Sequence, residues 1–332
     1  MDTFKALMVD EVDGKTTATI QALTPADLPE GDVTVAVAYS SLNYKDGLAV
    51  TGKARVLRSL PMVPGVDMSG TVVASDSADY KVGDKVLING FEHGEKRWGG
   101  FTQLTRVSSH HLVPVPEGLS LKQVSSIGTA GYTAMLSVMA LEEHGLNPTD
   151  RREVVVTGAA GGVGSMAVAI LGHLDYNVVA STGRAETHDY LRRLGASGFI
   201  DRSLLAEPSK RPLERERWAG AVDAVGGSTL TGLLLSMARG GSVAISGNAG
   251  GIAFSANVLP FILRGVNILG IDSNLCPQER RRAAWQRLAK ELPLDLIEEM
   301  ATEAPLTDVP ALSEDILQGK IRGRMVINVA GE

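Results

Sequence analysis

The sequence is poor in cysteine and has no excess of positive charge. Cys276 is the single cysteine among 332 residues, which excludes an intramolecular disulfide and favours a reducing compartment. Acidic residues outnumber basic ones by 38 to 32, for a formal net charge of −6. The chain as a whole therefore has no basic excess with which to bind nucleic acid or an anionic membrane.

Long apolar runs are also scarce. The apolar stretches at residues 154–156 and 178–180 are far too short to span a bilayer. Residues 1–9 carry Asp2 and Lys5 and no long apolar core, so they do not resemble a signal peptide. We therefore expect a cytoplasmic protein with neither a membrane nor a nucleic acid as its partner.

Glycine and apolar side chains, in contrast, are abundant. The chain contains 37 glycines, and 44% of its residues are hydrophobic, which is typical of a turn-rich globular protein. Its length suits two domains, each with its own core. In the first third, short apolar runs bounded by Gly or Asp predict successive strands at residues 33–38, 71–74 and 85–88. Strands without intervening helices indicate a barrel-like or α+β unit.

From about residue 128 the pattern alternates between strands and helices. Predicted strands lie at 153–157, 177–182, 221–225, 242–246 and 266–271, and helices at 163–174 and 186–194. This alternation predicts a doubly wound parallel sheet with right-handed crossovers. It stops after residue 271, where a basic amphipathic helix (278–292) and a last strand (325–329) follow. The simplest arrangement has residues 273–332 rejoining a first domain of residues 1–127, with residues 128–272 inserted as a second domain.

A glycine-rich turn, TGAAGGVG at 157–164, lies between a predicted strand and a predicted helix. Gly161 and Gly164 occupy the second and third glycine positions of the dinucleotide-binding pattern, and Ala159 occupies the first. Without a Cβ the backbone admits a pyrophosphate, whose charge the N–H groups at the helix start favour. The turn thus predicts a dinucleotide site, the alternative being a tight turn with no ligand. The expected contacts come from Ala160, Gly161, Gly162 and Val163.

The end of the second predicted strand indicates which dinucleotide binds. NAD sites usually place an acid there for the ribose 2′-hydroxyl, but this chain has Ser181, Gly183 and Arg184, with no acid before Glu186. Arg184 offers a planar, permanently charged fork for a 2′-phosphate, and Ser181 offers a hydroxyl donor. We therefore expect NADPH as the cofactor, the alternative being that Arg184 is a solvated loop charge.

Several further segments resemble the medium-chain dehydrogenase/reductase superfamily. They are SLNYKD (41–46), PGVDMSG (64–70), VGDKV (82–86) and GTAGYTAM (128–135), and the glycine turn is similar to that of the zinc-free quinone and enoyl reductase branch. The segments WGG (98–100), MALE (139–142), PFILR (260–264) and GIDS (270–273) look like the acrylyl-CoA reductase subgroup.

The resemblance implies a fold, an activity and an oligomeric state. The fold is an α/β architecture in which a GroES-like β-rich catalytic domain contains an inserted Rossmann doubly wound parallel sheet. The subgroup reduces the double bond of acrylyl-CoA to propionyl-CoA with NADPH, so a small-molecule acyl-CoA is the expected substrate. Members are commonly homodimers joined edge to edge through their Rossmann sheets.

The same comparison predicts that no metal is bound. Val66 stands where zinc-dependent relatives have a histidine, and a valine cannot ligate zinc. His110 and His111 are adjacent, and neighbouring residues of a strand would face opposite ways. The spacing of the histidines does not match a zinc site; they are His93, His110, His111, His144, His173 and His188.

Reduction of an unsaturated thioester needs a hydride donor, a group to stabilise the enolate oxygen and a proton for the α-carbon. The resemblance places Asn43 and Tyr44 beside the nicotinamide. Tyr44 is our candidate to contact the cofactor and protonate the substrate, and Asn43 our candidate to donate to the thioester oxygen. The alternative is a packing tyrosine whose hydroxyl is satisfied within the fold.

Other predicted cofactor contacts follow from position along the chain. The resemblance places Thr129 near the nicotinamide phosphate, Arg202 follows the segment 198–201 towards the adenosine end, and Asn248 follows the strand predicted at 242–246. Ser273 and Arg324 are further candidates, with a solvated Arg324 as the alternative. Coenzyme A is anionic, so the basic clusters at Lys53, Arg55 and Arg58 and at Arg280–Arg282 are candidate CoA contacts, or else solvated faces.

The sequence leaves three functions open. Besides acrylyl-CoA reduction, the same fold and cofactor suit an NADPH:quinone or general enone/alkenal reductase, because a fold does not determine its substrate. The third is a non-catalytic dinucleotide-binding protein, against which the presence of Asn43 and Tyr44 beside the glycine turn argues.

Overall fold

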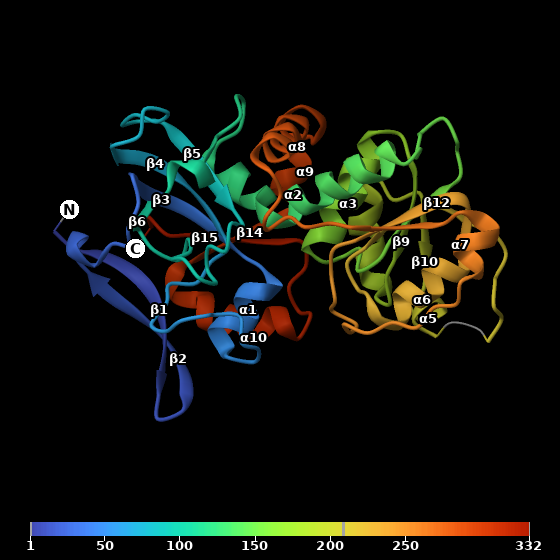
Figure 1. Ribbon diagram of the computed structural model, residues 1–332, viewed down its shortest axis with the longest axis horizontal. Coiled ribbons are helices and arrows are strands. Elements are labelled where there is room, and N and C mark those ends of the chain that lie inside the picture. Colours follow the sequence, from blue (N-terminus) through green and yellow to red (C-terminus); the bar gives the residue numbers. More distant parts are fainter. Residues whose placement is uncertain (1, 208–209, 332) are drawn as a thin grey trace. The chain divides into compact units, whose positions relative to one another are not determined.

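The computed structural model describes residues 2–207 and 210–331, which form two compact units. Unit 1 comprises the chain up to Thr129, Ser273–Ala289 and the segment from Ile297 onwards, and unit 2 comprises Ala130–Asp272 and Lys290–Leu296. The sequence predicted boundaries at 127/128 and 272/273. It did not predict that residues 290–296 return to the second unit. The predicted fold class, a β-rich domain plus a doubly wound parallel sheet, is confirmed (Figure 1).

Unit 1 is built on a sheet in the order β14-β15-β3-β4-β5-β7, with β6 paired to β3 and a separate β1–β2 hairpin. Its pairings are antiparallel except that of β14 with β15. Its elements are β1 (Phe4–Val12), β2 (Lys15–Leu23), η1 (Pro25–Asp27), β3 (Val33–Leu42), α1 (Tyr44–Thr51), β4 (Asp67–Ser75), β5 (Lys85–Asn89), β6 (Leu104–Val107), η2 (Ser109–His111), β7 (Val113–Pro114), β14 (Ala301–Pro305), η4 (Leu306–Asp308), α10 (Val309–Leu317) and β15 (Arg324–Asn328).

Strand β3 shows why this sequence makes a half-buried sheet. Val33, Val35 and Val37 are buried, whereas the residues between them are partly exposed, as the two-residue period of a strand requires. The predicted strands at 33–38, 71–74 and 85–88 fall within β3, β4 and β5. The predicted last strand, 325–329, overlaps β15 and extends one residue beyond it. Strand β15 pairs with β3 and so returns the tail to this sheet.

Three helices have residues in both units: α2 (Leu121–Glu143), α8 (Gln278–Glu291) and α9 (Leu294–Met300). Helix α2 is long and apolar enough to cross a membrane, but 89% of its most apolar window is buried inside the structure, as in the core helix of a folded chain. Gly128 interrupts α2 with a φ of 51° and a ψ of −161°, a backbone conformation that suits glycine.

Unit 2 is a six-stranded parallel sheet in the order β10-β9-β8-β11-β12-β13. Chain order reverses between the central strands β8 and β11, which makes that pair the switch point where such sheets bind ligands. Its elements are β8 (Glu153–Val156), α3 (Gly162–His173), β9 (Asn177–Ser181), η3 (Ala185–Thr187), α4 (His188–Arg193), β10 (Gly198–Ile200), α5 (Ser203–Ala206), β11 (Trp218–Asp223), α6 (Gly227–Ser236), β12 (Met237–Ile245), α7 (Leu259–Arg264) and β13 (Asn267–Gly270).

The parallel strands read as continuous apolar runs because helices cover both faces. Val154, Val155 and Val156 of β8 are at most 1% exposed. The segment 186–194, predicted to be a charged, surface-facing helix, exposes Asp189, Arg192 and Arg193 to solvent. The segment begins as the short η3 and continues as α4, in which Tyr190 and Leu191 are buried.

Candidate functional site

The glycine turn lies at the carboxyl end of β8, beside the switch point of the sheet. A Cβ on Gly164 would come within 2.2 Å of the Gly158 carbonyl oxygen, so no side chain fits where helix α3 meets the turn. Gly158 itself has a φ of 58°, which favours glycine. Glycine at positions 158 and 164 therefore allows helix α3 to begin immediately after the turn that follows β8.

The start of helix α3 provides donors for a phosphate. Gly161 is the N-cap residue, and no side chain caps the helix. The first N–H groups of a helix have no partner within it, so those of Gly162 and Val163 are available to an anion. The first-turn amides and the positive end of the helix dipole together suit a pyrophosphate. The geometry of this turn therefore fits the dinucleotide that the sequence predicts.

A set of hydroxyl hydrogen bonds holds the loop that carries Arg184. The Arg184 N–H donates to Thr182 Oγ1 at 3.2 Å, and Thr187 Oγ1 donates to the Arg184 carbonyl at 2.6 Å. The hydroxyls of Thr182 and Thr187 also bond to each other at 3.1 Å. The sequence analysis did not identify either threonine as a site residue. Ser181, a predicted donor, is only 2% exposed.

Arg202 lies across the backbone of Gly183. A Cβ on Gly183 would come within 2.7 Å of Arg202 Nε and 3.0 Å of its Cδ. The loop after β9 and the segment after β10 thus bring the predicted residues Gly183, Arg184 and Arg202 to one edge of the sheet. Two arginines at the place where NAD-binding sheets carry an acid favour a phosphorylated ribose.

The next loops of the same edge follow β11 and β12. The buried carboxylate of Asp223 accepts hydrogen bonds from Thr157 Oγ1 at 2.5 Å and from the backbone N–H groups of Val225 and Gly226. Asp223 was also missed, and it ties the start of the glycine turn to the loop after β11. The predicted residue Asn248 is exposed in the loop after β12, at the same edge.

Unit 1 contains a buried polar network centred on Asp67, which is 1% exposed. Its carboxylate accepts hydrogen bonds from the hydroxyls of Ser41 (2.5 Å) and Thr129 (2.6 Å) and from the side-chain amides of Asn43 (2.8 Å) and Asn89 (2.6 Å). Sequence reasoning used the neighbouring Val66 and passed over Asp67. An acid placed directly at the start of a buried strand was the available signal.

The network includes three residues that the sequence nominated for cofactor or substrate. Arg324 is 2% exposed and donates to the Ser126 carbonyl, Asn43 Oδ1 and Ser41 Oγ. The alternative of a solvated Arg324 is therefore wrong. Thr129 donates both its N–H and its hydroxyl to Asp67. Their contacts with a cofactor stay predictions.

Asn43 begins helix α1 and forms a capping box with Asp46. Its side-chain N–H₂ faces the carboxylates of Asp67 at 2.8 Å and Asp46 at 3.2 Å. Its predicted donation to a thioester oxygen stays a prediction, and it would require one of these bonds to break. The Asn-x-x-Asp spacing at 43–46 was the signal that identified Asp46.

Asp46 is a second buried carboxylate, 1% exposed. Burial and the nearby charge of Asp67 raise the pKa of Asp46 to about 7, against hydrogen bonds from Asn43 and Val66 that lower it. Burial lowers the pKa of the Arg324 guanidinium, and the charges of Asp67 and Asp46 oppose this. The cluster therefore places two buried carboxyl groups beside one buried arginine, and the raised pKa of Asp46 favours its protonated form below about pH 7.

Tyr44 occupies the first position of helix α1 and is 41% exposed. Across residues 2–207 and 210–331, no hydrogen bond to its hydroxyl is formed. The alternative of a packing tyrosine with a satisfied hydroxyl is therefore wrong. The Asp67 network holds Asn43, the neighbour of Tyr44, so it fixes the backbone from which this phenol projects.

The adjacent histidines do not lie in a strand, as the sequence reasoning assumed, but in the 3-10 helix η2. His93 Nδ1 contacts the Trp98 carbonyl at 2.7 Å, and its Nε2 contacts His111 Nδ1 at 3.1 Å. Burial lowers the pKa of His93 to about 4, so this ring is neutral. Among the described residues, no group of three or more His, Cys, Asp or Glu side chains is placed to hold a metal ion.

The second basic cluster is not a solvent-facing group of three arginines. Arg281 is fully buried, and its guanidinium donates to the carbonyls of Asn89, Ser273 and Asn274 and lies over the Phe91 ring. The prediction that Arg281 contacts CoA is wrong, because main-chain carbonyls already accept the hydrogen bonds that its guanidinium donates. Ser273 is thus joined to helix α8, and its predicted cofactor contact stays a prediction.

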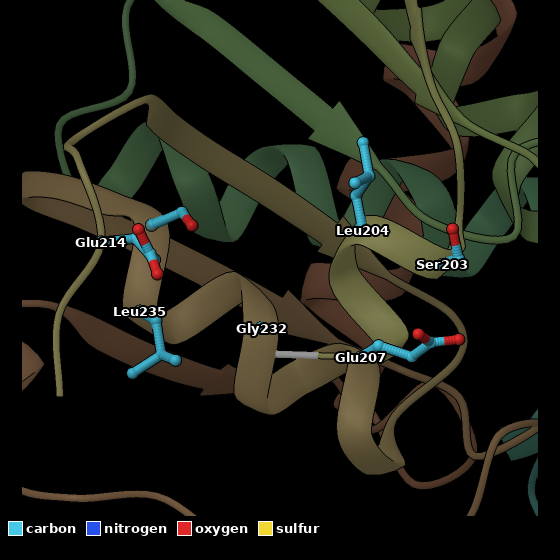
Figure 2. A pocket seen from close by; sticks show the side chains of 7 residues that line it. Ser203, Leu204, Glu207, Glu214, Gly232 and Leu235 are labelled. Carbon is cyan, nitrogen blue, oxygen red and sulfur yellow. The ribbon is translucent and has the colours of Figure 1, made fainter. Parts of the chain in front are cut away.

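A shallow pocket of about 290 Å³ lies elsewhere in unit 2, between α5 and α6. Figure 2 shows Glu214 and Leu235 on one side of it, with Ser203, Leu204 and Glu207 on the other. Its two glutamates and the absence of a cation among its lining residues do not suit an anionic dinucleotide. The pocket is therefore separate from the glycine turn and its arginines.

Two family models match the chain. Residues 29–117 match the alcohol dehydrogenase GroES-like domain, and residues 162–290 match the family described as zinc-binding dehydrogenase. The chain is 53% identical over 328 residues to an acrylyl-CoA reductase, AcuI, of Ruegeria pomeroyi, covering 98% of this chain and 99% of that protein.

Two solved structures are similar over nearly the whole chain. The YhdH protein of Escherichia coli K-12 with bound NADPH is 49% identical, with a TM-score of 0.95, and 98% of this chain and 99% of that one are covered. The YhfP protein of Bacillus subtilis with NAD bound is 42% identical, with a TM-score of 0.95 and coverage of 99% and 100%. YhfP is described as a putative quinone oxidoreductase.

Proposed function

This chain belongs to the medium-chain dehydrogenase/reductase superfamily, among the relatives of the acrylyl-CoA reductase AcuI, and on that premise we propose that it reduces acrylyl-CoA to propionyl-CoA with NADPH. The observation that carries the proposal is the 53% identity to AcuI over 98% of the chain. The glycine turn and the two arginines at the edge of its sheet support the choice of cofactor.

The residues present fit NADPH. The first-turn amides of α3 and the turn at Ala160–Val163 would hold the pyrophosphate, with Ser181, Gly183, Arg184 and Arg202 at the adenosine ribose. Bound NADPH supplies the hydride for the β-carbon of the substrate. The protein's own part is to orient the double bond, support the charge that develops on the thioester oxygen and deliver a proton to the α-carbon. We assign the last role to Tyr44, because this residue is 41% exposed and its hydroxyl forms no hydrogen bond within the described residues.

The substrate proposal predicts a ranking of thioesters and quinones. We expect kcat/KM for acrylyl-CoA to exceed that for crotonyl-CoA and for a benzoquinone by at least roughly tenfold, since an added methyl group is worth about 1–3 kcal/mol of discrimination. NADPH oxidation measured with the three acceptors in parallel tests this. A higher kcat/KM for the quinone would establish instead the quinone reductase activity that the name of YhfP suggests. No turnover with any acceptor would leave the non-catalytic binding function.

The cofactor proposal predicts that Arg184→Ala weakens NADPH binding by roughly 10- to 100-fold and NADH binding by less than about twofold. A charge-assisted bond to a phosphate is worth about 1.5–3 kcal/mol, and NADH has no 2′-phosphate. Dissociation constants from fluorescence titration with both cofactors measure the difference. Arg193→Ala removes an exposed arginine of α4 and serves as the matched control. Equal losses for the two cofactors would remove the 2′-phosphate role.

Three further features of the protein are part of the proposal. Val66 is an apolar, buried residue where zinc-dependent relatives have a ligand, which supports a zinc-independent reaction. The single cysteine, Cys276, is free and buried, which supports a cytoplasmic location.

Strand β13 is the last strand of its sheet, with Ile262 and Leu263 exposed on the preceding helix, which supports a homodimer joined at that edge. Sedimentation analysis distinguishes this dimer from a monomer.

A further inference from the structure

Helix α1 ends in a segment that carries three cations within six residues. Gly52 terminates the helix with a φ of 67°, and a Cβ there would come within 2.2 Å of Thr16 Oγ1. The chain therefore leaves the helix at this point, and Lys53, Arg55 and Arg58 follow on the exposed segment. In a chain with a net charge of −6, this is a local concentration of positive charge.

The three cations differ in what they contact. Lys53 forms an ion pair with Glu314 of α10. The guanidinium groups of Arg55 and Arg58 are exposed, and within the described ranges neither forms a hydrogen bond or an ion pair. Their charge is thus not neutralised by the fold. A pair of uncommitted arginines presents the planar forks that bind phosphate oxygens in two places at once.

Glu95 connects Arg58 to Lys45, the residue that follows the proposed catalytic Tyr44. The Arg58 N–H donates to the Glu95 carbonyl at 2.9 Å, and Lys45 Nζ contacts Glu95 Oε1 at 2.9 Å. Lys45 directly follows Tyr44 in the first turn of α1. The carboxylate of Glu95 also accepts from the side-chain amide of Asn274 at 3.3 Å. The carboxylate of Glu95 is therefore occupied by Lys45 and Asn274, and Glu95 links the Arg58 backbone to the residue that follows Tyr44.

We propose that Arg55 and Arg58 form the subsite that binds the phosphate groups of the coenzyme A portion of the substrate. This inference rests on the proposed function, because it assigns the far end of the same acyl-CoA. Coenzyme A carries its phosphates at the end opposite the thioester, joined by the flexible pantetheine arm. With the thioester at Tyr44, the exposed segment after α1 is available to that arm and its phosphates. The rival cluster at Arg280–Arg282 lacks a free central arginine, since Arg281 is buried.

The proposal predicts that the arginines act on a substrate only when it carries phosphates. For Arg55→Ser and Arg58→Ser, we expect kcat/KM for acrylyl-CoA to fall about tenfold each, since a charge-assisted hydrogen bond to a charged group is typically worth at least this factor. For acrylyl-pantetheine, which has the same thioester and no phosphate, kcat/KM stays within about twofold of the wild-type value. Binding at a distance from the reacting atoms thus contributes to turnover of the natural substrate alone.

The matched control is Lys81→Ser, which removes an exposed cation from the turn between β4 and β5. We expect it to leave kcat/KM unchanged for both acrylyl-CoA and acrylyl-pantetheine. Equal losses for the two thioesters would assign the arginines a structural role and overturn the proposal, as would an unchanged kcat/KM for acrylyl-CoA. A rise in the KM for NADPH matching the loss would also overturn it, because the arginines would then serve the dinucleotide.

A direct binding measurement separates this proposal from the proposed function. Free coenzyme A titrated into the full chain by calorimetry reports the subsite without any turnover. Wild-type protein that binds coenzyme A but does not reduce acrylyl-CoA would contradict the proposed function alone. Affinity weakened about tenfold by either arginine substitution would still support the subsite, and equal affinity of all variants would overturn it.

Discussion

Replacing Asp67 with alanine is expected to lower the free energy of unfolding of unit 1 by about 3–5 kcal/mol, because it removes one partner of a buried ion pair. Arg324 Nη2 lies 3.7 Å from Asp67 Oδ2, and both side chains are at most 3% exposed. The substitution leaves the guanidinium buried without this charge and leaves the donors of Thr129 and Asn89 without an acceptor. Urea titration followed by tryptophan fluorescence measures the loss, since Trp285 bonds to Asn89 within the network.

Two variants frame this result. Asp79→Ala removes an exposed acid of the same unit and should change the free energy of unfolding by less than about 0.5 kcal/mol. Asp67→Asn retains the shape and one acceptor oxygen, so its loss should be smaller than that of the alanine variant. NADPH affinity, read at the glycine turn, checks that unit 2 remains folded. A loss below about 1 kcal/mol for Asp67→Ala would show that the pair does not hold unit 1 together.

The Asp67→Asn substitution should also change how the free energy of unfolding depends on pH. The pKa of Asp46 is raised from 3.8 to about 7 by burial and by the charge of Asp67. Between these pH values the folded state holds a proton that the unfolded state releases, so the free energy of unfolding falls as pH rises. The stability associated with protonated Asp46 is therefore fully present below pH 3.8 and is lost as pH rises through about 7. In Asp67→Asn one of the two causes is gone, and the loss should shift to lower pH. An unshifted profile would assign the effect to burial alone.

Replacing Tyr44 with phenylalanine is expected to lower kcat with acrylyl-CoA by roughly 100-fold, the lower end of what a positioned acid contributes to a proton transfer. The ring and its contacts remain, while the hydroxyl is lost. The isotope effect on kcat with NADPH deuterated at the transferred position should increase, because the chemical step would then limit turnover. Stopped-flow measurement of NADPH oxidation gives both quantities.

The control for Tyr44 is Tyr39→Phe, which removes the hydroxyl of a half-buried tyrosine of β3 and is expected to leave kcat within about twofold. A raised KM for acrylyl-CoA with unchanged kcat would make Tyr44 a binding residue. An unchanged kcat and KM would rule out proton donation by this side chain and direct the search towards a bound water.

The parallel sheet and its glycine turn were predictable from the sequence because both depend on neighbours in the chain. Apolar runs of strand length alternating with helical patterns predict β8, β9, β11, β12 and β13, but not the three-residue β10, and a strand that runs through glycines into a helix predicts the turn. At Gly164 the steric reason is local, since a side chain there would meet the Gly158 carbonyl six residues away. The absence of an acid after β9 and the presence of Arg184 are likewise readable in a few consecutive residues.

The buried network of unit 1 was decided by the tertiary structure alone. It brings Ser41, Asn43, Asp67, Thr129 and Arg324 together from segments that are up to 283 residues apart, and no local pattern specifies such partners. Arg281 makes the same point, because the sequence RRR looks like an exposed basic cluster until its central guanidinium is found under three carbonyls. A charged side chain can be buried only where distant groups supply its hydrogen bonds. The sequence alone therefore identified the edge at which we propose that the cofactor binds, whereas the packing of distant segments decided which polar residues hold the segment of Tyr44 and which arginines form no bond within the described residues.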